Sequence, residues 1–211
     1  YFPNAGSRYL DPYGKIERII NNYEYISFDF GPTLMTWMKS AHPATYELII
    51  EADRSSVKRL SHGNALAQSF NHTILPLDHP RDARMQIDWG IADFIHRFGR
   101  DPEGMWLPEA AINAFIVDML SEAGIRFVIL SPWQCRSWQR VDGAWADTEP
   151  VPYDTPFIIE GTSGTSVTAF FYHSKLSIGI SFDHMLRDAD TLYADLLAIR
   201  DVHHPALIHT A

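Results

Sequence analysis

Short apolar runs alternate with longer stretches of helical periodicity along most of this chain, and this alternation limits the folds that it can adopt. Residues 82–98 place apolar side chains at helical spacing before Gly99, and the stretch that begins at Pro108 does the same before Gly124. Strands and helices in this order favour a parallel sheet or barrel covered by helices. The runs that predict strands stand at 25–30, 70–75, 104–107 and 126–130.

The stretch between residues 136 and 172 has a different pattern. Asp142-Gly143 stands at the centre of 138–146, as is typical of a hairpin turn. A second hairpin is predicted by the runs at 157–160 and 166–172. The sequence therefore predicts an α/β fold with a β-hairpin-rich insertion around 136–172. Further helices are predicted at 33–40, 46–60 and 188–199, and a last strand at 206–210.

Composition excludes several classes of protein. The formal net charge is −9 and no basic tract occurs, so nucleic acids and anionic membrane surfaces are poor partners. No apolar run approaches the roughly 18 residues of a membrane span. Cys135 is the single cysteine, which excludes an intrachain disulfide and a multi-cysteine zinc site, and with no visible signal peptide it favours a cytoplasmic location. Acidity, many aromatic residues and ten histidines are compatible with a neutral polar ligand such as a sugar.

The run Gly-Met-Trp-Leu-Pro-Glu at 104–109 holds the strongest chemical candidate. Glu109 follows a short predicted strand, and the ends of barrel strands form the active-site face. Trp106 offers a ring for stacking. Cleavage of a glycosidic bond needs one carboxylate to attack or to activate water, and a second acid to protonate the leaving oxygen. From the spacing alone, the stronger interpretation is that Glu109 only complements the positive end of the following helix.

Four other residues are weaker candidates. His62 and His72 are ten residues apart, which fits no compact metal motif, although an imidazole can hydrogen-bond a sugar hydroxyl. A structural role is the stronger interpretation of His72 by itself. Asp29 ends a predicted strand and would line a pocket or, as we favour, cap the helix that begins near Thr33. Trp133 follows another predicted strand and fits a core position as well as a pocket rim.

Three blocks taken together resemble the glycoside hydrolases of family 57. They run from Asn21 to Leu34, from His62 to Leu77 and from Gly104 to Glu109, and they occur in the order that the family has, over nearly the whole chain. In that family the nucleophile is the Glu that closes a Trp-Leu-Pro-Glu run, which here is Glu109. The resemblance therefore overturns the helix-end interpretation of Glu109 and, less strongly, the structural interpretation of His72.

The resemblance implies an incomplete (β/α)7 TIM-like barrel that catalyses retaining hydrolysis or transfer on α-glucans, with no cofactor and no metal. The family's general acid is an Asp just beyond a strand like 206–211, so we expect it after the last residue of this chain. Residues 1–211 would then be a single fragment of a catalytic barrel, inactive by itself, that continues beyond both ends. We expect Glu109 to be the nucleophile, and an oligosaccharide or polysaccharide to contact His72, Trp106, His62, Asp29 and Trp133.

Two other functions stay open at this point. A metal-dependent carbohydrate deacetylase on a related incomplete barrel would need an Asp and two His around a divalent ion that activates water, and Asp29, His62 and His72 are its candidates. A noncatalytic carbohydrate-binding barrel is the second. Leu66 replaces a Glu that the family often has soon after its Gly-Asn, which favours this reading, whereas the intact run that ends at Glu109 opposes it.

Overall fold

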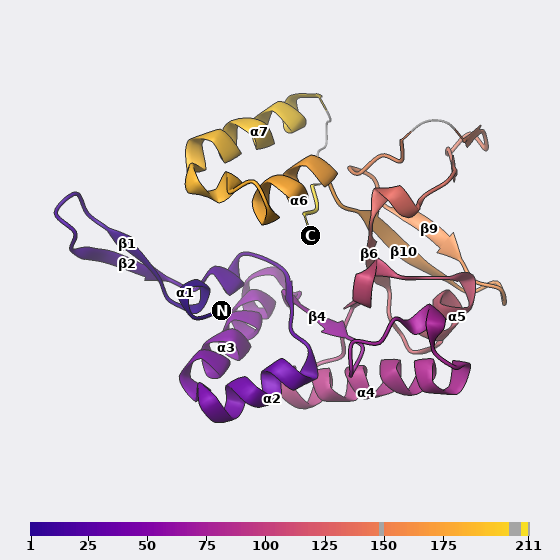
Figure 1. Cartoon of the computed structure of the whole chain (residues 1–211), viewed down its shortest axis with the longest axis horizontal. Helices are drawn as coiled ribbons and strands as arrows, with labels where there is room; N and C mark the ends of the chain where they lie inside the picture. Colours follow the sequence, from indigo (N-terminus) through magenta and orange to yellow (C-terminus); the bar gives the residue numbers. More distant parts are fainter. Residues whose placement is uncertain (148–149, 203–207, 211) are drawn as a thin grey trace.

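A six-stranded sheet forms the centre of the computed structural model, which describes residues 1–147, 150–202 and 208–210 (Figure 1). Its strand order is β3-β4-β5-β6-β10-β9; the first five strands are parallel and β9 is antiparallel to β10. The predicted α/β class is confirmed, while the seven-stranded barrel stays a prediction. The strands are β3 (Phe28–Asp29), β4 (Ala65–Gln68), β5 (Gly104–Trp106), β6 (Phe127–Leu130), β9 (Phe157–Glu160) and β10 (Ser166–Phe171).

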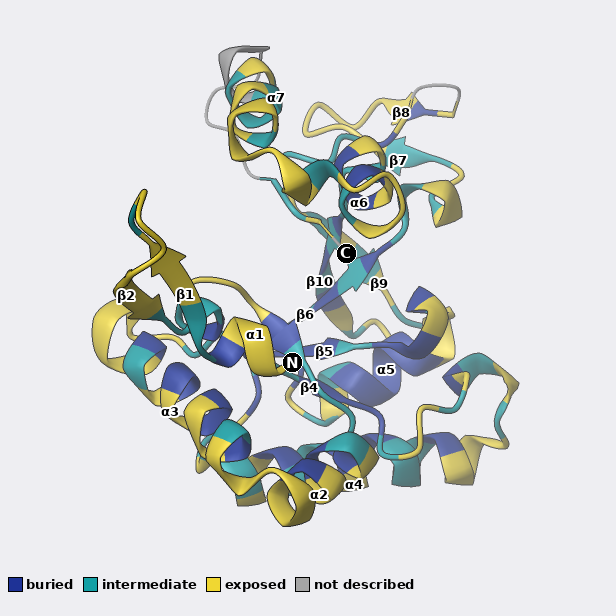
Figure 2. Cartoon of the chain, turned by 60° about the vertical axis from the view of Figure 1, so that its left-hand side comes forward, coloured by how far each residue is buried: buried dark blue, intermediate teal, exposed yellow. Residues whose placement is uncertain are grey.

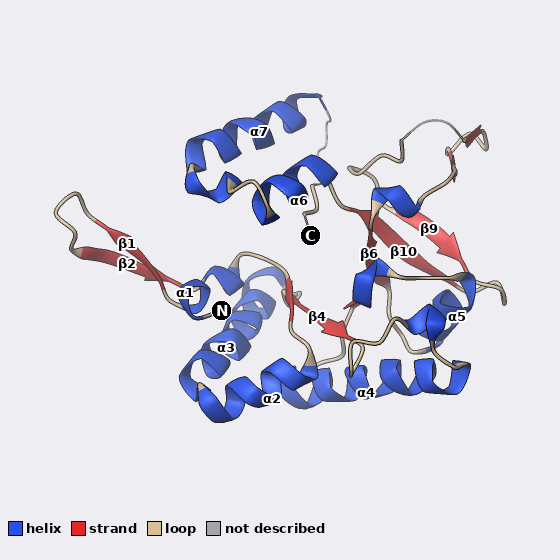
Figure 3. Cartoon of the chain, viewed as in Figure 1, coloured by secondary structure: helices blue, strands red, loops and turns tan. Residues whose placement is uncertain are grey.

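Helices connect the first four parallel strands, β3 to β6, as the alternation in sequence predicts. Helix α4 packs against β4, and α5 packs against β9 and β10 (Figure 3). Two helices follow β10 and lie away from the longer helices that precede β6 (Figure 1). The helices are α2 (Pro32–Ala41) and α3 (Pro43–Leu60) before β4, α4 (Pro80–Phe98) before β5, α5 (Ala114–Glu122) before β6, then α6 (Ser174–Ser181) and α7 (Ala189–Val202). Within the described residues, no helix combines the length and apolar character needed to cross a membrane.

The core lies between the sheet and the helices that pack on it. Side chains alternate along β6, where Val128 and Leu130 are buried and the residues between them are only partly buried. Ile87 of α4 and Leu120 of α5 are fully buried in the same cluster. Each such side chain contributes roughly 1.5–3 kcal/mol by leaving water. Figure 2 shows the buried residues on the strands and on the helix sides turned to them, while α7 is largely exposed.

The strand predicted at 70–75 is wrong, because the chain forms β4 earlier, at 65–68. Alanine is a weak strand former, which hid this element from the sequence pattern. Small residues suit the site because α4 approaches β4 closely: a Cβ atom on Gly90 would lie 2.1 Å from the carbonyl oxygen of Gln68. His72 therefore lies in the turn beyond a strand and not within one.

The helix predicted from Pro108 begins only at Ala114. Glu109 and Ala110 have positive φ values of 57° and 51°, and a helix cannot pass through such backbone angles. The side chain of Asn113 then starts α5 by accepting a hydrogen bond from the Ile116 N–H at 2.9 Å.

Both predicted hairpins form. β7 (Trp138–Gln139) pairs with β8 (Trp145–Ala146), and β9 pairs with β10. However, β10 is also the parallel neighbour of β6, so the second hairpin belongs to the main sheet and not to an insertion. An unpredicted hairpin, β1 (Ser7–Leu10) with β2 (Ile16–Ile20), follows the short helix α1 (Phe2–Ala5) and projects from the body (Figure 1).

The last predicted strand, at 206–210, lies partly outside the described residues, and residues 208–210 form no strand. The His209 carbonyl oxygen accepts a hydrogen bond from the His173 N–H at 2.7 Å. This contact places His209 just beyond the carboxyl end of β10.

Candidate active site

Several predicted site residues stand where neighbouring parallel strands end. Asp29 is the last residue of β3 and Trp106 is the last residue of β5. Between them, Gln68 ends β4 and is the register partner of Trp106. Trp133 lies in η4 (Pro132–Gln134), directly after β6. Because parallel strands bring their carboxyl ends to one edge, these residues share the edge where α/β proteins bind ligands, here called the carboxyl edge.

Glu109 projects from this edge on the short turn η3 (Pro108–Ala110). Its backbone angles are φ 57° and ψ 19°, and Ala110 is also left-handed. Such a conformation costs an ordinary residue about 1–2 kcal/mol, and strain of this kind gathers at functional sites. The Glu109 carboxylate is exposed and makes no hydrogen bond or ion pair with any described residue. Since Glu109 lies outside α5, the helix-end interpretation is wrong.

The turn that carries Glu109 is tied to the next loop of the same edge. The side-chain Nε2 of Gln134 donates to the Ala110 carbonyl oxygen at 2.7 Å, and its Oε1 accepts from the Ser131 N–H at 3.0 Å. Within the turn, the Ala110 N–H donates to the Leu107 carbonyl at 2.8 Å. One side chain thus connects the loop after β6 to the turn after β5.

Asp29 does not cap α2, so that prediction is wrong. Gly31 is the cap residue, and the Asp29 Oδ2 instead accepts a hydrogen bond from Gln68 Nε2 at 2.8 Å. Burial raises the pKa of Asp29 to about 6, although the nearby His72 acts in the opposite direction. His72 is exposed and has a positive φ of 57°. The structure therefore brings Asp29 and His72 together, as a half-buried acid beside a strained, accessible imidazole.

A hollow of about 350 Å³ opens beside this pair. The Oγ of Ser69, the residue after β4, is buried nearby with no hydrogen-bond partner in the described part of the chain. An unpaired buried hydroxyl is costly, so it indicates a place where stability is not optimised. Glu109 does not line this hollow. Its lining includes Tyr1, Asp29, Phe30, Gln68, Phe70 and His72.

His62 lies at the opposite edge, which the strands enter. It precedes β4, and its Nδ1 lies 3.0 Å from a carboxylate oxygen of Glu103, which precedes β5. The structure therefore does not bring His62 together with Asp29 and His72. Across the described residues, no three His, Cys, Asp or Glu side chains gather into a group that could hold a metal ion.

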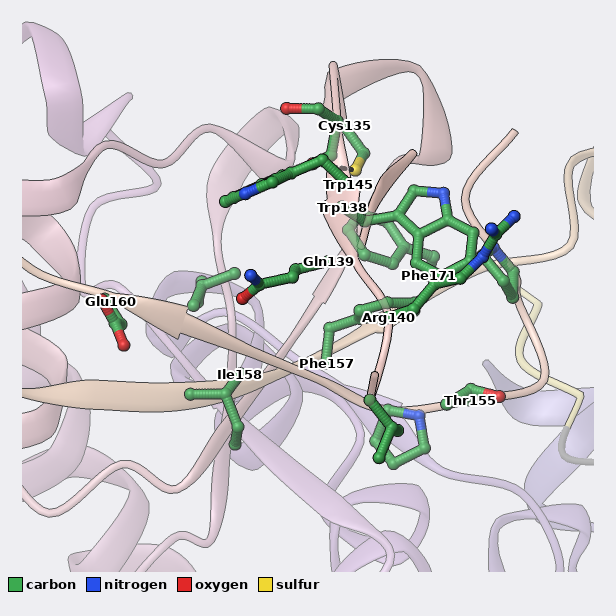
Figure 4. A pocket seen from close by; sticks show the side chains of 15 residues that line it. Cys135, Trp138, Gln139, Arg140, Trp145, Thr155, Phe157, Ile158, Glu160 and Phe171 are labelled. Atoms are coloured by element: carbon green, nitrogen blue, oxygen red, sulfur yellow. Dashed lines mark hydrogen bonds between the residues drawn. The ribbon is translucent and has the colours of Figure 1, made fainter. Parts of the chain in front are cut away.

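A hollow of about 810 Å³ lies between the β7–β8 hairpin and β9, and none of the predicted site residues lines it (Figure 4). Trp138, Trp145 and Phe157 line it, and Glu160 lies apart from the tryptophans in this view. Trp133 stands elsewhere and is 79% exposed, so a core position for it is wrong. This hollow is larger than the one beside Asp29 and His72, so volume alone does not single out the carboxyl edge.

The model of glycosyl hydrolase family 57 matches residues 13–209, which is nearly the whole chain. The chain belongs to glycosyl hydrolase family 57. The resemblance inferred from the three sequence blocks is confirmed.

Family 57 enzymes are among the similar proteins. Alpha-amylase 1 of Dictyoglomus thermophilum is 32% identical over 106 residues, which are 50% of this chain and 15% of that protein. The 4-alpha-glucanotransferase of Thermococcus litoralis is 26% identical over 112 residues, 53% of this chain and 16% of that protein. This chain thus spans about one sixth of the length of these relatives.

Two solved structures share the fold. The crystal structure of the Thermococcus litoralis 4-alpha-glucanotransferase has a TM-score of 0.57 and 22% identity, covering 76% of this chain and 23% of that one. The exo-type maltose-forming amylase of Pyrococcus sp. ST04 has a TM-score of 0.55 and 17% identity, covering 74% of this chain and 24% of that one. At these identities the likeness concerns the fold alone.

Sequence reasoning missed two residues at the carboxyl edge, Gln134 and Ser69. Gln134 lies in a stretch that suggests a pocket rim, but no local pattern indicates a bond to Ala110, which is 24 residues earlier. Ser69 stands directly before the strand predicted at 70–75, and its burial depends on the close approach of α4. Both follow from tertiary packing and have no signature in the chain itself.

Proposed function

We propose that this chain carries the nucleophile of a retaining enzyme that hydrolyses or transfers α-glucan chains, and that the nucleophile is Glu109. The observation that carries the proposal is the state of its carboxylate: exposed, unpaired within the described residues, and held on a strained turn at the carboxyl edge. Because no described residue engages this carboxylate, it is free to approach a sugar at the carboxyl edge. Membership of family 57 and the names of the similar amylase and glucanotransferase support the substrate class.

In this mechanism a Glu109 oxygen attacks the anomeric carbon of the sugar. The glycosidic C–O bond breaks, and its electron pair goes to the leaving oxygen, which takes a proton from a second carboxyl group. Water or an acceptor hydroxyl then attacks the glycosyl–enzyme ester, gives its proton to that same group and releases Glu109. The two carboxyl groups of retaining enzymes lie about 5–5.5 Å apart.

The second carboxyl group is proposed to belong to an Asp beyond residue 211, as the family resemblance implies. The position of His209 beyond the carboxyl end of β10 supports this, because the chain there is already near the edge that carries Glu109. The 211-residue chain by itself is then expected to be inactive.

Sugar binding is assigned to the other residues of the carboxyl edge. Trp106 is partly exposed and Trp133 is largely exposed, so both can stack on sugar faces. Asp29 and His72 are proposed to hydrogen-bond sugar hydroxyls in the hollow beside them. His62 is left out because it lies at the opposite edge. For the same reason, the deacetylase alternative loses its set of Asp29, His62 and His72.

Replacement of Glu109 by Gln in the full natural protein tests the proposal. Turnover of a maltooligosaccharide should fall on the order of 10⁴-fold or more, because an amide cannot form the ester intermediate. Binding of the same sugar, measured by calorimetry, should persist. A fluoride-activated glucosyl donor should label Glu109 in the wild-type protein, as mass spectrometry of its peptides would show.

Glu47→Gln is the matched control, because Glu47 is an exposed carboxylate on the outer helix α3. It should keep wild-type turnover. Near wild-type turnover in Glu109→Gln would exclude Glu109 as the nucleophile. Sugar binding by the wild-type protein without turnover or adduct would instead identify a noncatalytic carbohydrate-binding barrel.

A further inference from the structure

We infer that Gln134 is a positioning residue for the nucleophile: its side-chain amide holds the left-handed turn that presents Glu109. The inference rests on the proposed function of Glu109 and assigns the device that keeps its carboxylate in place. Gln134 stands on η4 after β6, whereas Glu109 stands on η3 after β5, so the contact joins two loops of the carboxyl edge.

The turn has a reason to need such support. Glu109 and Ala110 are consecutive non-glycine residues with positive φ, and the turn's own bonds are two short-range ones, Ala110 N–H to Leu107 at 2.8 Å and Ala111 N–H to Pro108 at 3.0 Å. Strained backbone persists only where the surroundings over-determine it. Gln134 supplies a bond from outside the turn, at 2.7 Å to the Ala110 carbonyl.

Both polar atoms of the Gln134 side-chain amide form hydrogen bonds. Its Oε1 accepts from the Ser131 N–H at 3.0 Å, which fixes the side chain to its own loop, and its Nε2 then reaches Ala110. A side chain anchored in this way loses little further freedom when it makes the second bond. Ala110 is only 5% exposed, so the position of its carbonyl is well defined.

Displacement of the turn would act on catalysis more than on folding. A nucleophile displaced by about 1 Å can lose about 10²-fold in rate. Gln134 itself is on the surface, so its replacement leaves the apolar core intact. A positioning role therefore predicts a fall in kcat with little change in KM or in the thermal midpoint.

The experiment compares two variants of the full natural protein. Gln134→Met keeps the length of the side chain and removes both bonds. Gln134→Glu keeps the acceptor for Ser131 and replaces only the N–H donor to Ala110. In both, kcat on a maltooligosaccharide should fall about 10–100-fold with KM within about twofold, and labelling of Glu109 by the activated glucosyl donor should slow in parallel. A pH profile separates the added charge in Gln134→Glu, which shifts the profile, from lost positioning, which lowers its plateau.

Gln139→Met is the matched control, since Gln139 also donates its side-chain amide to a main-chain carbonyl, that of Gly143 at 2.9 Å, but on the β7–β8 hairpin. It should keep wild-type kcat. Amide hydrogen exchange at Ala110 and Ala111 should speed up in Gln134→Met and not in the control.

Wild-type kcat in both Gln134 variants would overturn the inference, as would an equal loss in Gln139→Met. These outcomes are distinguishable from failure of the proposed function, since an inactive Glu109→Gln beside fully active Gln134 variants refutes only the positioning role. Turnover retained in Glu109→Gln refutes the nucleophile and the positioning role with it.

Discussion

Polar side chains at the amino ends of the parallel strands have more hydrogen-bond partners than those at the carboxyl ends. At the amino ends, carboxylates are well supplied with donors. Asp118 accepts hydrogen bonds from the turn before β10, through the hydroxyl and main-chain groups of Thr162 and Ser163 and the hydroxyl of Thr165, and these bonds lower its pKa. Asp53, which is 1% exposed, accepts from the N–H that begins β4.

At the carboxyl ends, polar side chains have fewer hydrogen-bond partners. Gln68 is the one side-chain donor to Asp29 in the described residues, and burial raises the pKa of this acid. The Ser69 hydroxyl has no partner there, and Glu109 stands free on a strained turn. A satisfied group stabilises the fold, whereas an unsatisfied one costs stability and leaves its atoms available to a ligand. The difference agrees with the proposal that ligands bind at the carboxyl edge, and it predicts that hydrogen bonds at the amino edge contribute more to stability.

The largest effect on stability is expected at the amino edge, from Asp53→Asn. The Asp53 carboxylate accepts hydrogen bonds from Arg100 Nε at 2.9 Å and Nη2 at 2.8 Å. It also accepts the hydrogen bond from the main-chain N–H that begins β4. Loss of one partner from such a buried pair costs about 3–5 kcal/mol, because the other charge stays behind uncompensated. Urea denaturation at pH 7 measures this loss in the free energy of unfolding.

Asp88→Asn is the control for this variant. Asp88 pairs with Arg84 on the exposed side of α4, where both side chains are more than a third exposed. Its loss should cost no more than about 1 kcal/mol. Equal costs for the two substitutions would show that the amino edge is no stronger than an ordinary surface.

The equivalent substitution at the carboxyl edge, Asp29→Asn, should increase the free energy of unfolding and not lower it. Because the pKa of Asp29 in the fold is about 6, above its ordinary 3.8, the folded state holds this proton more tightly than the unfolded chain does. The wild-type protein therefore loses stability as the pH rises from about 4 through 6. Asp29→Asn removes that loss and should stabilise the chain by about 1–3 kcal/mol at pH 7. Urea denaturation from pH 4 to pH 8 follows the difference.

Asp118→Asn provides the matched comparison. Its lowered pKa means that Asp118 stabilises the fold above the ordinary carboxyl range, and this contribution is lost as the pH falls below that range. The substitution should destabilise the chain at pH 7, and the deficit should shrink in acid. If both variants shift stability in the same direction with pH, the contrast between the two edges does not hold.

The sequence predicted most helices and most strands to within a few residues, but it did not predict β4, the start of α5 or the arrangement of the site. The periodicity in 82–98 is long and ends at Gly99, so α4 could be located within two residues of its ends. β4 was not predicted because Ala65 and Ala67 have low strand propensity. These small residues stand in a strand on which α4 packs closely. Short strands depend on neighbours that are distant in sequence, and a local pattern cannot contain that information.

For the site, the residue types were predicted and their arrangement was not. Glu109 was identified from its run of neighbours, but the left-handed turn that frees it from α5 appears only in the fold. Asp29 was placed at a strand end, yet its partner Gln68 lies 39 residues away. His62 and His72 belong to the same sequence block, but β4 carries the chain from one edge of the sheet to the other between them.

The smallest effect is expected from His62→Ala, which tests that division directly. His62 meets Glu103 in an exposed pair, with 64% and 34% of the two side chains accessible, so its loss should cost no more than about 1 kcal/mol. In the full natural protein KM for a maltooligosaccharide should stay within about twofold, because sugar bound at the carboxyl edge does not reach this residue. His72→Ala is the matched variant, and loss of one hydrogen bond there should raise KM by about 3–10-fold. If His62→Ala raised KM as much as His72→Ala, the substrate would have to contact both edges, and the amino edge could no longer be assigned to stability alone.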